Sequence, residues 1–272
     1  MKYCRFLLND QVHYGAVEDR NGEPWIVDLT RAPEEDLAFR LEHGRATSWS
    51  FDFEPMPVSA ADLLPPVTPS KIVCVGRNYR DHVKELDNDI PIEPLLFFKP
   101  PSSLLKPGGI VRLPAASARV DFEGELALVI GQRTTRLQPD ADWRAVVRGY
   151  TLVNDVTARD LQKTDGQWTR AKGFDTFCPV GPLVSDELDP EAGLIVETRV
   201  NGELRQHGST RDFIFRIPEL LVYISAAITL EPGDLILTGT PSGVGPLAAG
   251  DRVEVFIDGL GVLANTAQTD AA

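Results

Sequence analysis

The segment "DFEGELALVI", residues 121–130, has the composition of a buried strand but carries two glutamates two positions apart. Because successive side chains of a strand point to opposite faces, Glu123 and Glu125 share one face with Ala127 and Val129. At a rise of roughly 3.3 Å per residue the two glutamate backbones are about 7 Å apart, so their carboxylates can converge. A solvent-exposed strand end is the commoner explanation of an isolated Glu-x-Glu. A metal site or an acid/base pair is the alternative, and the rest of the chain must decide.

The composition is that of a globular protein. With 272 residues, 43% of them hydrophobic, the chain can bury a large core as one domain or as one domain with a smaller partner. The longest apolar run, residues 220–230, is too short to cross a bilayer, and the first ten residues lack the pattern of a signal peptide. Cys4, Cys74 and Cys178 are scattered and odd in number. They indicate reduced thiols in a cytoplasmic protein and exclude a cysteine-based zinc site.

The charge balance bears on partners. The formal net charge is −13, and no local cluster of basic residues interrupts it. An acidic surface repels phosphate, so nucleic acid and anionic membranes are excluded as partners. A small anionic substrate is not excluded, because a few local cations suffice to bind it.

The sequence divides near a proline-rich segment, residues 61–70, which we interpret as a linker. We therefore predict a small β-rich N-terminal domain over 1–64 and a larger domain over 70–272. In the first, strands are expected at 2–9, 12–19 and 24–29, with an Asn-Gly turn at 21–22 and a short helix at 33–44.

The second part is predicted to be mainly β, which places the chain in the α+β class. Strands are expected at 71–76, 125–131, 149–156, 193–206 with a second Asn-Gly turn, 234–239 and 252–259. Helical periodicity is found at 140–148 and 216–228.

Four further features carry polar groups, and each is weak when taken alone. Asp155 ends a predicted strand, where turn formers and helix caps are common. Lys172 lies in a predicted Gly/Pro-rich loop, where most lysines are solvated. His82 and Glu85 are one helical turn apart and can form a hydrogen bond, as ordinary surface pairs also do. The glycine-rich run 237–245 lacks the Gly-Lys-Ser/Thr of a phosphate-binding loop.

Together, seven blocks in this order resemble the fumarylacetoacetate hydrolase family, and closely its acylpyruvate hydrolase and oxaloacetate decarboxylase branch. The resemblance covers residues from about 70 to 265. It rests on the blocks "KIVCVGRNYRDHVKEL", "PLLFFKPPSSLL", "DFEGELALVIG", "GYTLVNDVTARDLQ", "WTRAKGFDTFCPVGP", "VNGELRQ" and "ITLEPGDLILTGTPSGVGPL". It implies the mixed β-sandwich roll of the family's C-terminal domain, preceded by the small N-terminal domain. It identifies the family more specifically than the substrate.

The resemblance implies that Glu123, Glu125 and Asp155 hold a divalent cation. The donor set agrees, because three carboxylates without interleaved Cys or His suit Mg²⁺ or Mn²⁺ better than Zn²⁺, with Ca²⁺ as a third option.

The resemblance also implies a 2-oxo acid substrate that chelates the ion and is cleaved through a metal-bound enolate. Lys172 is the candidate for an assisting cation, and the His82/Glu85 pair is the candidate for activating water. Residues 86–94, rich in proline and acidic groups, are expected to form a mobile lid over the site. Further substrate contacts are implied at Arg77, Arg159, Gln162 and Thr240.

Three hypotheses for function follow. The first is a metal-dependent hydrolase of an acylpyruvate or related 1,3-dicarbonyl acid. The second uses the same site as an oxaloacetate decarboxylase or as a 2-hydroxyhepta-2,4-diene-1,7-dioate isomerase or decarboxylase of aromatic catabolism. The third is a non-catalytic member that binds an oxo acid. A cytoplasmic homodimer is expected in each case.

Overall fold

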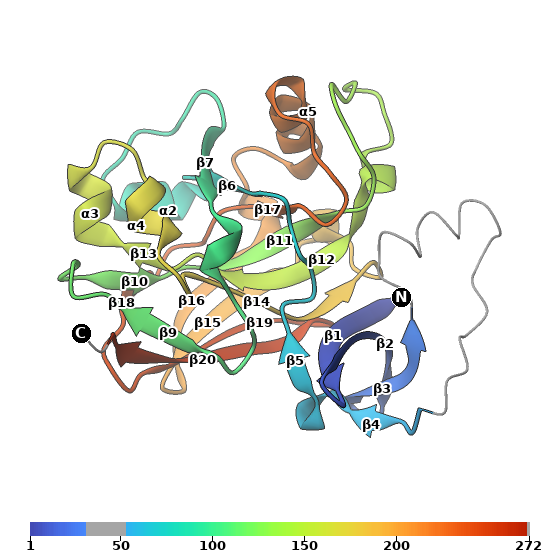
Figure 1. Cartoon of the computed structure of the whole chain (residues 1–272). Helices are drawn as coiled ribbons and strands as arrows, with labels where there is room; N and C mark the ends of the chain where they lie inside the picture. Colours follow the sequence, from blue (N-terminus) through green and yellow to red (C-terminus); the bar gives the residue numbers. More distant parts are fainter. Residues whose placement is uncertain (31–52, 271–272) are drawn as a thin grey trace.

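The computed structural model describes residues 1–30 and 53–270, and strands dominate it (Figure 1). The largest sheet has twelve strands. Ten follow the order β4 (Met56–Pro57), β3 (Glu23–Thr30), β2 (Gln11–Arg20), β1 (Lys2–Leu8), β14 (Cys178–Ser185), β12 (Val147–Asn154), β11 (Gly124–Ile130), β17 (Leu235–Leu237), β6 (Ile72–Gly76) and β7 (Leu95–Lys99). The other two are β5 (Asp62–Leu64), which pairs with β1, and β8 (Leu104–Leu105), which pairs with β14.

Two smaller sheets and four helices complete the described part of the chain. The five-stranded sheet has the order β16 (Glu203–Ser209), β15 (Ile195–Val200), β19 (Arg252–Ile257), β20 (Gly261–Thr269) and β9 (Ile110–Leu113). The three-stranded sheet is β13 (Thr157–Ala158), β10 (Val120–Phe122) and β18 (Gly245–Pro246). The helices are α2 (Arg80–Glu85), α3 (Arg159–Thr164), α4 (Thr169–Gly173) and α5 (Ile217–Ala227). None of these helices is long and apolar enough to span a membrane.

The two faces of β11 show how the core is organised. Leu126, Leu128 and Ile130 belong to the main apolar core, which also takes side chains from β15, β19, β20 and α5. Ala127 and Val129 point to the opposite face and pack in a second apolar cluster. The alternation expected from the sequence is therefore confirmed, and it carries Glu125 to the same face as Ala127 and Val129.

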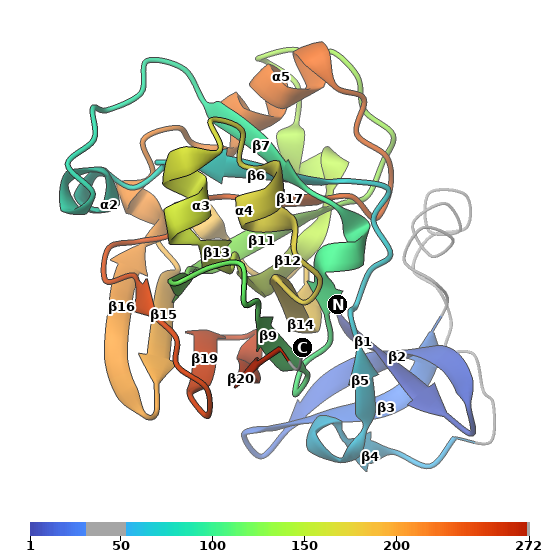
Figure 2. The same ribbon diagram turned by 60° about the vertical axis from the view of Figure 1, so that its left-hand side comes forward.

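The N-terminal strands β1–β5 form a unit at one edge of the large sheet (Figure 2). They enclose an apolar cluster of their own, and β1 joins the rest of the sheet by pairing with β14. The three predicted strands and the turn at Asn21–Gly22 are confirmed, with both turn residues at positive φ, as a type I′ hairpin requires. The domain boundary stays a prediction, although β5 ends at Leu64. The helix predicted at 33–44 lies outside the described residues.

One predicted helix in the second part is wrong. Residues 140–148 form a 3₁₀ turn, Trp143–Val146, and β12 begins at Val147. Only Val147 and Arg148 of this segment belong to β12, where Val147 pairs with Ile130 of β11, and a nine-residue helix is costly to nucleate. The other predicted helix is confirmed as α5, and the predicted strands of this part are present.

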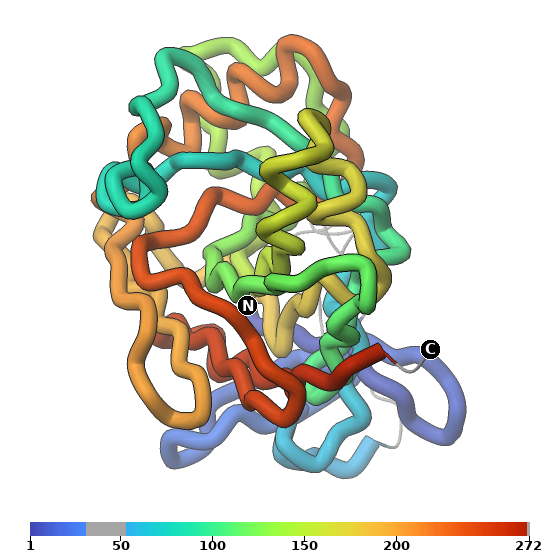
Figure 3. The backbone as a smooth tube through the Cα atoms, turned by 90° about the vertical axis from the view of Figure 1, so that its left-hand side faces the viewer, coloured from blue at the N-terminus to red at the C-terminus, as the bar shows by residue number. Residues whose placement is uncertain are grey.

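Helices α2, α3 and α4 gather on one side of the molecule, at the left in Figure 1. The tube in Figure 3 shows the segment of α3 and α4 beside the chain that leads into β10, and α3 contacts both β10 and β13. This side therefore brings the Glu-Gly-Glu segment, the end of β12 and three short helices together.

Candidate metal and catalytic site

The Glu-Gly-Glu segment is bent between β10 and β11, and the end of β12 holds the bend. The Glu123 amide donates to Asn154 Oδ1 at 2.9 Å, and the Asp155 amide donates to the Glu123 carbonyl at 2.8 Å. Gly124 allows β15 to approach, because a Cβ at that position would lie 2.1 Å from Thr198 Oγ1. These contacts place Asp155 beside the two glutamates.

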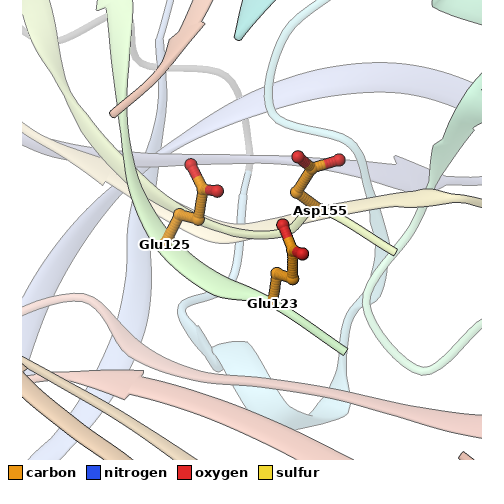
Figure 4. Close-up of side chains that lie close together, drawn as sticks. All are labelled: Glu123, Glu125 and Asp155. Carbon is orange, nitrogen blue, oxygen red and sulfur yellow. The ribbon is translucent and has the colours of Figure 1, made fainter. Parts of the chain in front are cut away.

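The three carboxylates meet in the protein interior. Ligand oxygens of Glu123, Glu125 and Asp155 lie within 4.8 Å of one another, and Figure 4 shows the side chains converging on a common point. Glu123 is only 4% exposed and Glu125 only 2%. The interpretation of Glu-x-Glu as a solvent-exposed strand end is therefore wrong.

Three buried cations surround this carboxylate cluster of Glu123, Glu125 and Asp155. Lys172 Nζ lies 2.9 Å from Glu123 Oε2 and 2.5 Å from Asp155 Oδ2. Lys99 Nζ lies 2.7 Å from the other oxygen of Asp155. Arg159 pairs with Glu123 from the opposite side. The cluster is thus tightly paired at two of its three members.

Lys172 is not in a loop, as the sequence suggested, but on α4. The amide of Lys172 donates to the carbonyl of Trp168, which winds residues 169–173 into one helical turn. The turn directs Lys172 inward, where its side chain is 2% exposed and lies over the ring of Phe97 at 4.8 Å.

Glu125 is the exception among the three carboxylates. It accepts a hydrogen bond from the Gly239 amide at 2.8 Å, but no cation within the described residues forms an ion pair with it. Burial raises the pKa of Glu125 well above its usual range, and the neighbouring Asp155 and Glu123 raise it further. The site therefore favours either a proton or a metal cation at this carboxylate. Three converging oxygen ligands, one of them without an ion-pair partner in the described chain, fit a hard divalent ion.

In contrast to Glu125, the ion-paired groups Glu123 and Lys172 have pKa shifts that favour their charged forms. Burial by itself would raise the pKa of Glu123, but Lys172 and Arg159 outweigh burial and hold that pKa far below its usual range. Burial would likewise lower the pKa of Lys172, yet Asp155 and Glu123 raise it. Both groups are consequently charged at neutral pH, and Lys172 is a cation rather than a nucleophilic amine.

A histidine and a glutamate form the opposite side of the site. His82 Nδ1 lies 3.1 Å from Glu85 Oε2, and Glu85 Oε1 accepts a hydrogen bond from the Gly243 amide at 2.9 Å. Burial would raise the pKa of Glu85, but these hydrogen bonds lower it overall. An ionised Glu85 orients the ring so that Nδ1 carries a proton and Nε2 is free to accept one.

A pocket of about 440 Å³ brings nearly all the predicted residues together. Nine of the ten line it, and Glu85 lies behind His82. Arg159 donates to Gln162 Oε1 at 2.8 Å. The hydroxyl of Thr240 donates to the Gly124 carbonyl at 2.9 Å, so it supports the Glu-Gly-Glu bend as well as lining the pocket. The proposed lid, residues 86–94, is a loop after α2, and its mobility stays a prediction.

Sequence reasoning missed two charged residues of this network. Lys99 ends β7 and is buried against Asp155, but nothing in the sequence distinguishes it from the other lysines. Asp121 lies two positions before Glu123 and pairs with Arg159 at 3.0 Å. The alternation that grouped Glu123 with Glu125 extends to Asp121, so a signal for it was present.

A mainly β fold of this topology carries a buried acidic cluster that could hold a divalent ion, beside a His/Glu pair, which is the arrangement of a candidate metal-dependent enzyme. Comparison with known proteins agrees. Residues 71–268 match the family model described as fumarylacetoacetate (FAA) hydrolase C-terminal, and the chain belongs to this family.

Relatives match over most of the chain. A Mycobacterium tuberculosis protein is 44% identical over 267 residues, 97% of each chain. An oxaloacetate tautomerase of Bacillus subtilis is 48% identical over 211 residues, 72% of this chain and 69% of that protein. The solved structure of a 2-hydroxyhepta-2,4-diene-1,7-dioate isomerase from Mycobacterium marinum is 40% identical with a TM-score of 0.85 and covers 100% of both chains. The expected family and fold class are thus confirmed, and relatives with named activities are enzymes.

Proposed function

We propose that this protein is a divalent-cation-dependent enzyme of small 2-oxo acids, and that its primary reaction is keto–enol tautomerisation of an oxaloacetate-like acid. Mg²⁺ or Mn²⁺ is the proposed ion, with Ca²⁺ as a third option. One observation carries the proposal: the buried carboxylate of Glu125, which forms no ion pair within the described residues, lies in the same pocket as His82, whose ring is held by Glu85. The oxaloacetate tautomerase from Bacillus subtilis, at 48% identity, supports the choice of reaction.

The residues divide the work as follows. Glu123, Glu125 and Asp155 would hold the ion, which when bound supplies Lewis-acid polarisation of the 2-oxo group. Lys172 keeps a positive charge close to the oxygen on which negative charge grows. His82, oriented by Glu85, carries a proton between the carbon beside the oxo group and the oxo oxygen, which interconverts the keto and enol forms.

Hydrolytic cleavage of an acylpyruvate is the second candidate, and a specific observation favours it. The pocket has an apolar wall of Leu86, Phe97 and Trp168, with the two aromatic rings edge to face at 5.2 Å. Such a wall suits an alkyl or aryl group at the far end of the acid better than it suits a second carboxylate. In this reaction His82 would take a proton from water as that water adds to the distal carbonyl. Collapse of the adduct would then break the carbon–carbon bond and release a carboxylic acid and the enolate of pyruvate, which takes up the proton. Decarboxylation or isomerisation of a related dienoate would need the same site.

Substrate assays with and without metal test the proposal. Oxaloacetate prepared as the enol is followed by its ultraviolet absorbance, and acylpyruvates by loss of diketone absorbance and by pyruvate released. We expect metal-dependent acceleration of the first reaction that EDTA abolishes. Acceleration of acylpyruvate cleavage alone would establish the second candidate instead. Metal-dependent ligand binding without any turnover would contradict both and favour the non-catalytic alternative.

We further propose that the enzyme is a cytoplasmic homodimer. This proposal follows from the family resemblance and from the three free, buried cysteines of the described chain. Light scattering of the purified protein should give twice the 29.9 kDa chain mass. A clean monomer mass would contradict it.

A further inference from the structure

Asp121 is a buried carboxylate close to the candidate metal ligands that does not line the pocket. Its side chain is 0% exposed, and it accepts hydrogen bonds from two arginines. Arg159 Nε donates to Oδ2 at 3.0 Å, and Arg119 donates to both oxygens, at 2.8 and 3.1 Å. Arg119 lies at the surface with about half of its side chain exposed, whereas Arg159 faces the site.

The guanidinium of Arg159 is held on all three nitrogens. Nε is bound by Asp121, one terminal nitrogen by Gln162 and the other by Glu123. Its backbone is fixed too, since its amide donates to the Arg119 carbonyl at 2.8 Å. Each terminal nitrogen keeps a further N–H, so a guanidinium clamped in this way presents its terminal edge to the pocket.

The ion pair between Asp121 and Arg159 also affects how strongly Arg159 binds Glu123. Arg159 lies between two buried carboxylates, Asp121 and Glu123, and its single positive charge is shared by both. If Asp121 were neutral, Arg159 would become the undivided partner of Glu123 and would compete more strongly with a divalent ion for that carboxylate. The buried Nε–H would also lose its charged acceptor, and the guanidinium could turn.

We propose that Asp121 is a positioning residue that acts through Arg159 to keep Glu123 available as a metal ligand. This inference rests on the proposed function, because it presumes that Glu123 binds a divalent ion. It assigns Asp121 a task that no pocket contact shows. Partners that orient metal ligands from behind typically contribute 10–100-fold to metal affinity.

The test is the affinity for Mn²⁺ alone, measured by calorimetry on the full chain without substrate. Asp121→Asn keeps the shape of the side chain and removes its charge. We expect its dissociation constant for Mn²⁺ to rise about 10–100-fold. Asp160→Asn is the matched control, because Asp160 binds Ser117 and the Ala118 amide in the same region but makes no contact with the guanidinium of Arg159. It should bind Mn²⁺ like the wild type.

A double-mutant cycle with Arg159→Lys shows whether the effect passes through Arg159. In that background Asp121→Asn should weaken Mn²⁺ binding by much less than it does alone. Unchanged affinity in Asp121→Asn, equal losses in Asp160→Asn, or full additivity with Arg159→Lys would overturn the inference. If Asp121→Asn fails to fold, Asp121→Glu keeps the charge but shifts the carboxylate, and weaker binding is again expected. A wild-type protein that binds no Mn²⁺ would instead refute the proposed function.

Discussion

The carboxylate cluster and the helix that carries His82 face the same pocket but are held very differently. Glu123 and Asp155 are fixed by backbone hydrogen bonds between buried strands and by Lys99, Lys172 and Arg159. The six-residue α2 buries only His82 and Val83, and it runs directly into an exposed loop. Short elements with few buried contacts open most readily. The molecule thus combines a carboxylate cluster held by many buried contacts with a histidine on a short helix that has few.

The segment that leads into α2 has its own anchor. The side chain of Asn78 donates to the carbonyls of Phe215 and Thr238, and it accepts a hydrogen bond from the Phe215 amide. Arg77 before it has φ of 57°, a strained conformation for a residue other than glycine. From this anchor onward, the bond between Glu85 and the Gly243 amide ties α2 to the loop between β17 and β18. Substitutions in the carboxylate cluster should therefore affect metal binding, and substitutions in α2 should affect turnover.

The largest effect is expected at Glu125. The variant Glu125→Gln should lose measurable Mg²⁺ binding and fall to background activity, because it removes the carboxylate that has no other cation. Its melting temperature in EDTA should not fall, since the raised pKa of Glu125 favours the neutral carboxyl group when no metal is bound, and glutamine is also neutral and can still accept the hydrogen bond from the Gly239 amide. Calorimetry and thermal melts with and without Mg²⁺ provide both measurements. A variant that still binds Mg²⁺ with native affinity would show that the ion binds elsewhere.

The next effect belongs to α2. The variant His82→Ala should lower the turnover number by about 10²–10⁴-fold, the usual contribution of a general base, and leave Mg²⁺ affinity unchanged. Measuring both acylpyruvate hydrolysis and oxaloacetate decarboxylation by this variant separates the role of His82 from that of the metal. Hydrolysis needs activated water, so it should fall further than decarboxylation of oxaloacetate, which needs mainly the metal. A parallel loss of Mg²⁺ binding would mean that the two regions are not independent.

Most of the carboxylate cluster could be predicted from the sequence for physical reasons. The alternation of strand side chains predicts that Glu123 and Glu125 share a face, and they do converge although Glu123 lies between β10 and β11 rather than within one strand. The pair His82 and Glu85 follows equally well from helical spacing. Local periodicity is enough for both, because each pair lies within one element or beside its end.

What local periodicity could not supply is contact between distant segments. Lys99 reaches Asp155 across 56 residues, and no pattern within "LLFFK" distinguishes that lysine from a solvated one. The same limit contributes to the error at 140–148, where a 3₁₀ turn leads into β12 and Val147 already pairs with Ile130 of the distant β11. Joint resemblance to a family recovered Asp155 and Lys172, which propensity alone would have assigned to a turn and a loop.

The two lysines of the site offer a further comparison, with an effect on stability. The variant Lys99→Met should lower the free energy of unfolding by about 3–5 kcal/mol, because it leaves Asp155 buried with one partner fewer. It also makes the carboxylate cluster more negative, so Mg²⁺ should raise its melting temperature more than that of the wild type. Denaturant unfolding in EDTA and thermal melts with Mg²⁺ measure the two effects. Equal stabilisation of both proteins by Mg²⁺ would show that Lys99 does not share the electrostatic field of the ion.

The smallest expected effect concerns acid and tests how α2 is held. Since the hydrogen bonds from His82 and Gly243 lower the pKa of Glu85 in the folded protein, its ionised form stabilises the fold. That contribution is fully present above the pKa of glutamate in the unfolded chain, about 4.3, and is lost as the pH falls through the lower folded value. The wild type should therefore melt slightly above Glu85→Gln at pH 7, and the difference should shrink toward pH 3. Glu203→Gln, on an exposed hairpin, corrects for the general loss of a negative charge. A difference that stays constant with pH would mean that Glu85 holds α2 by shape rather than by charge, and that His82 relies on another partner for its orientation.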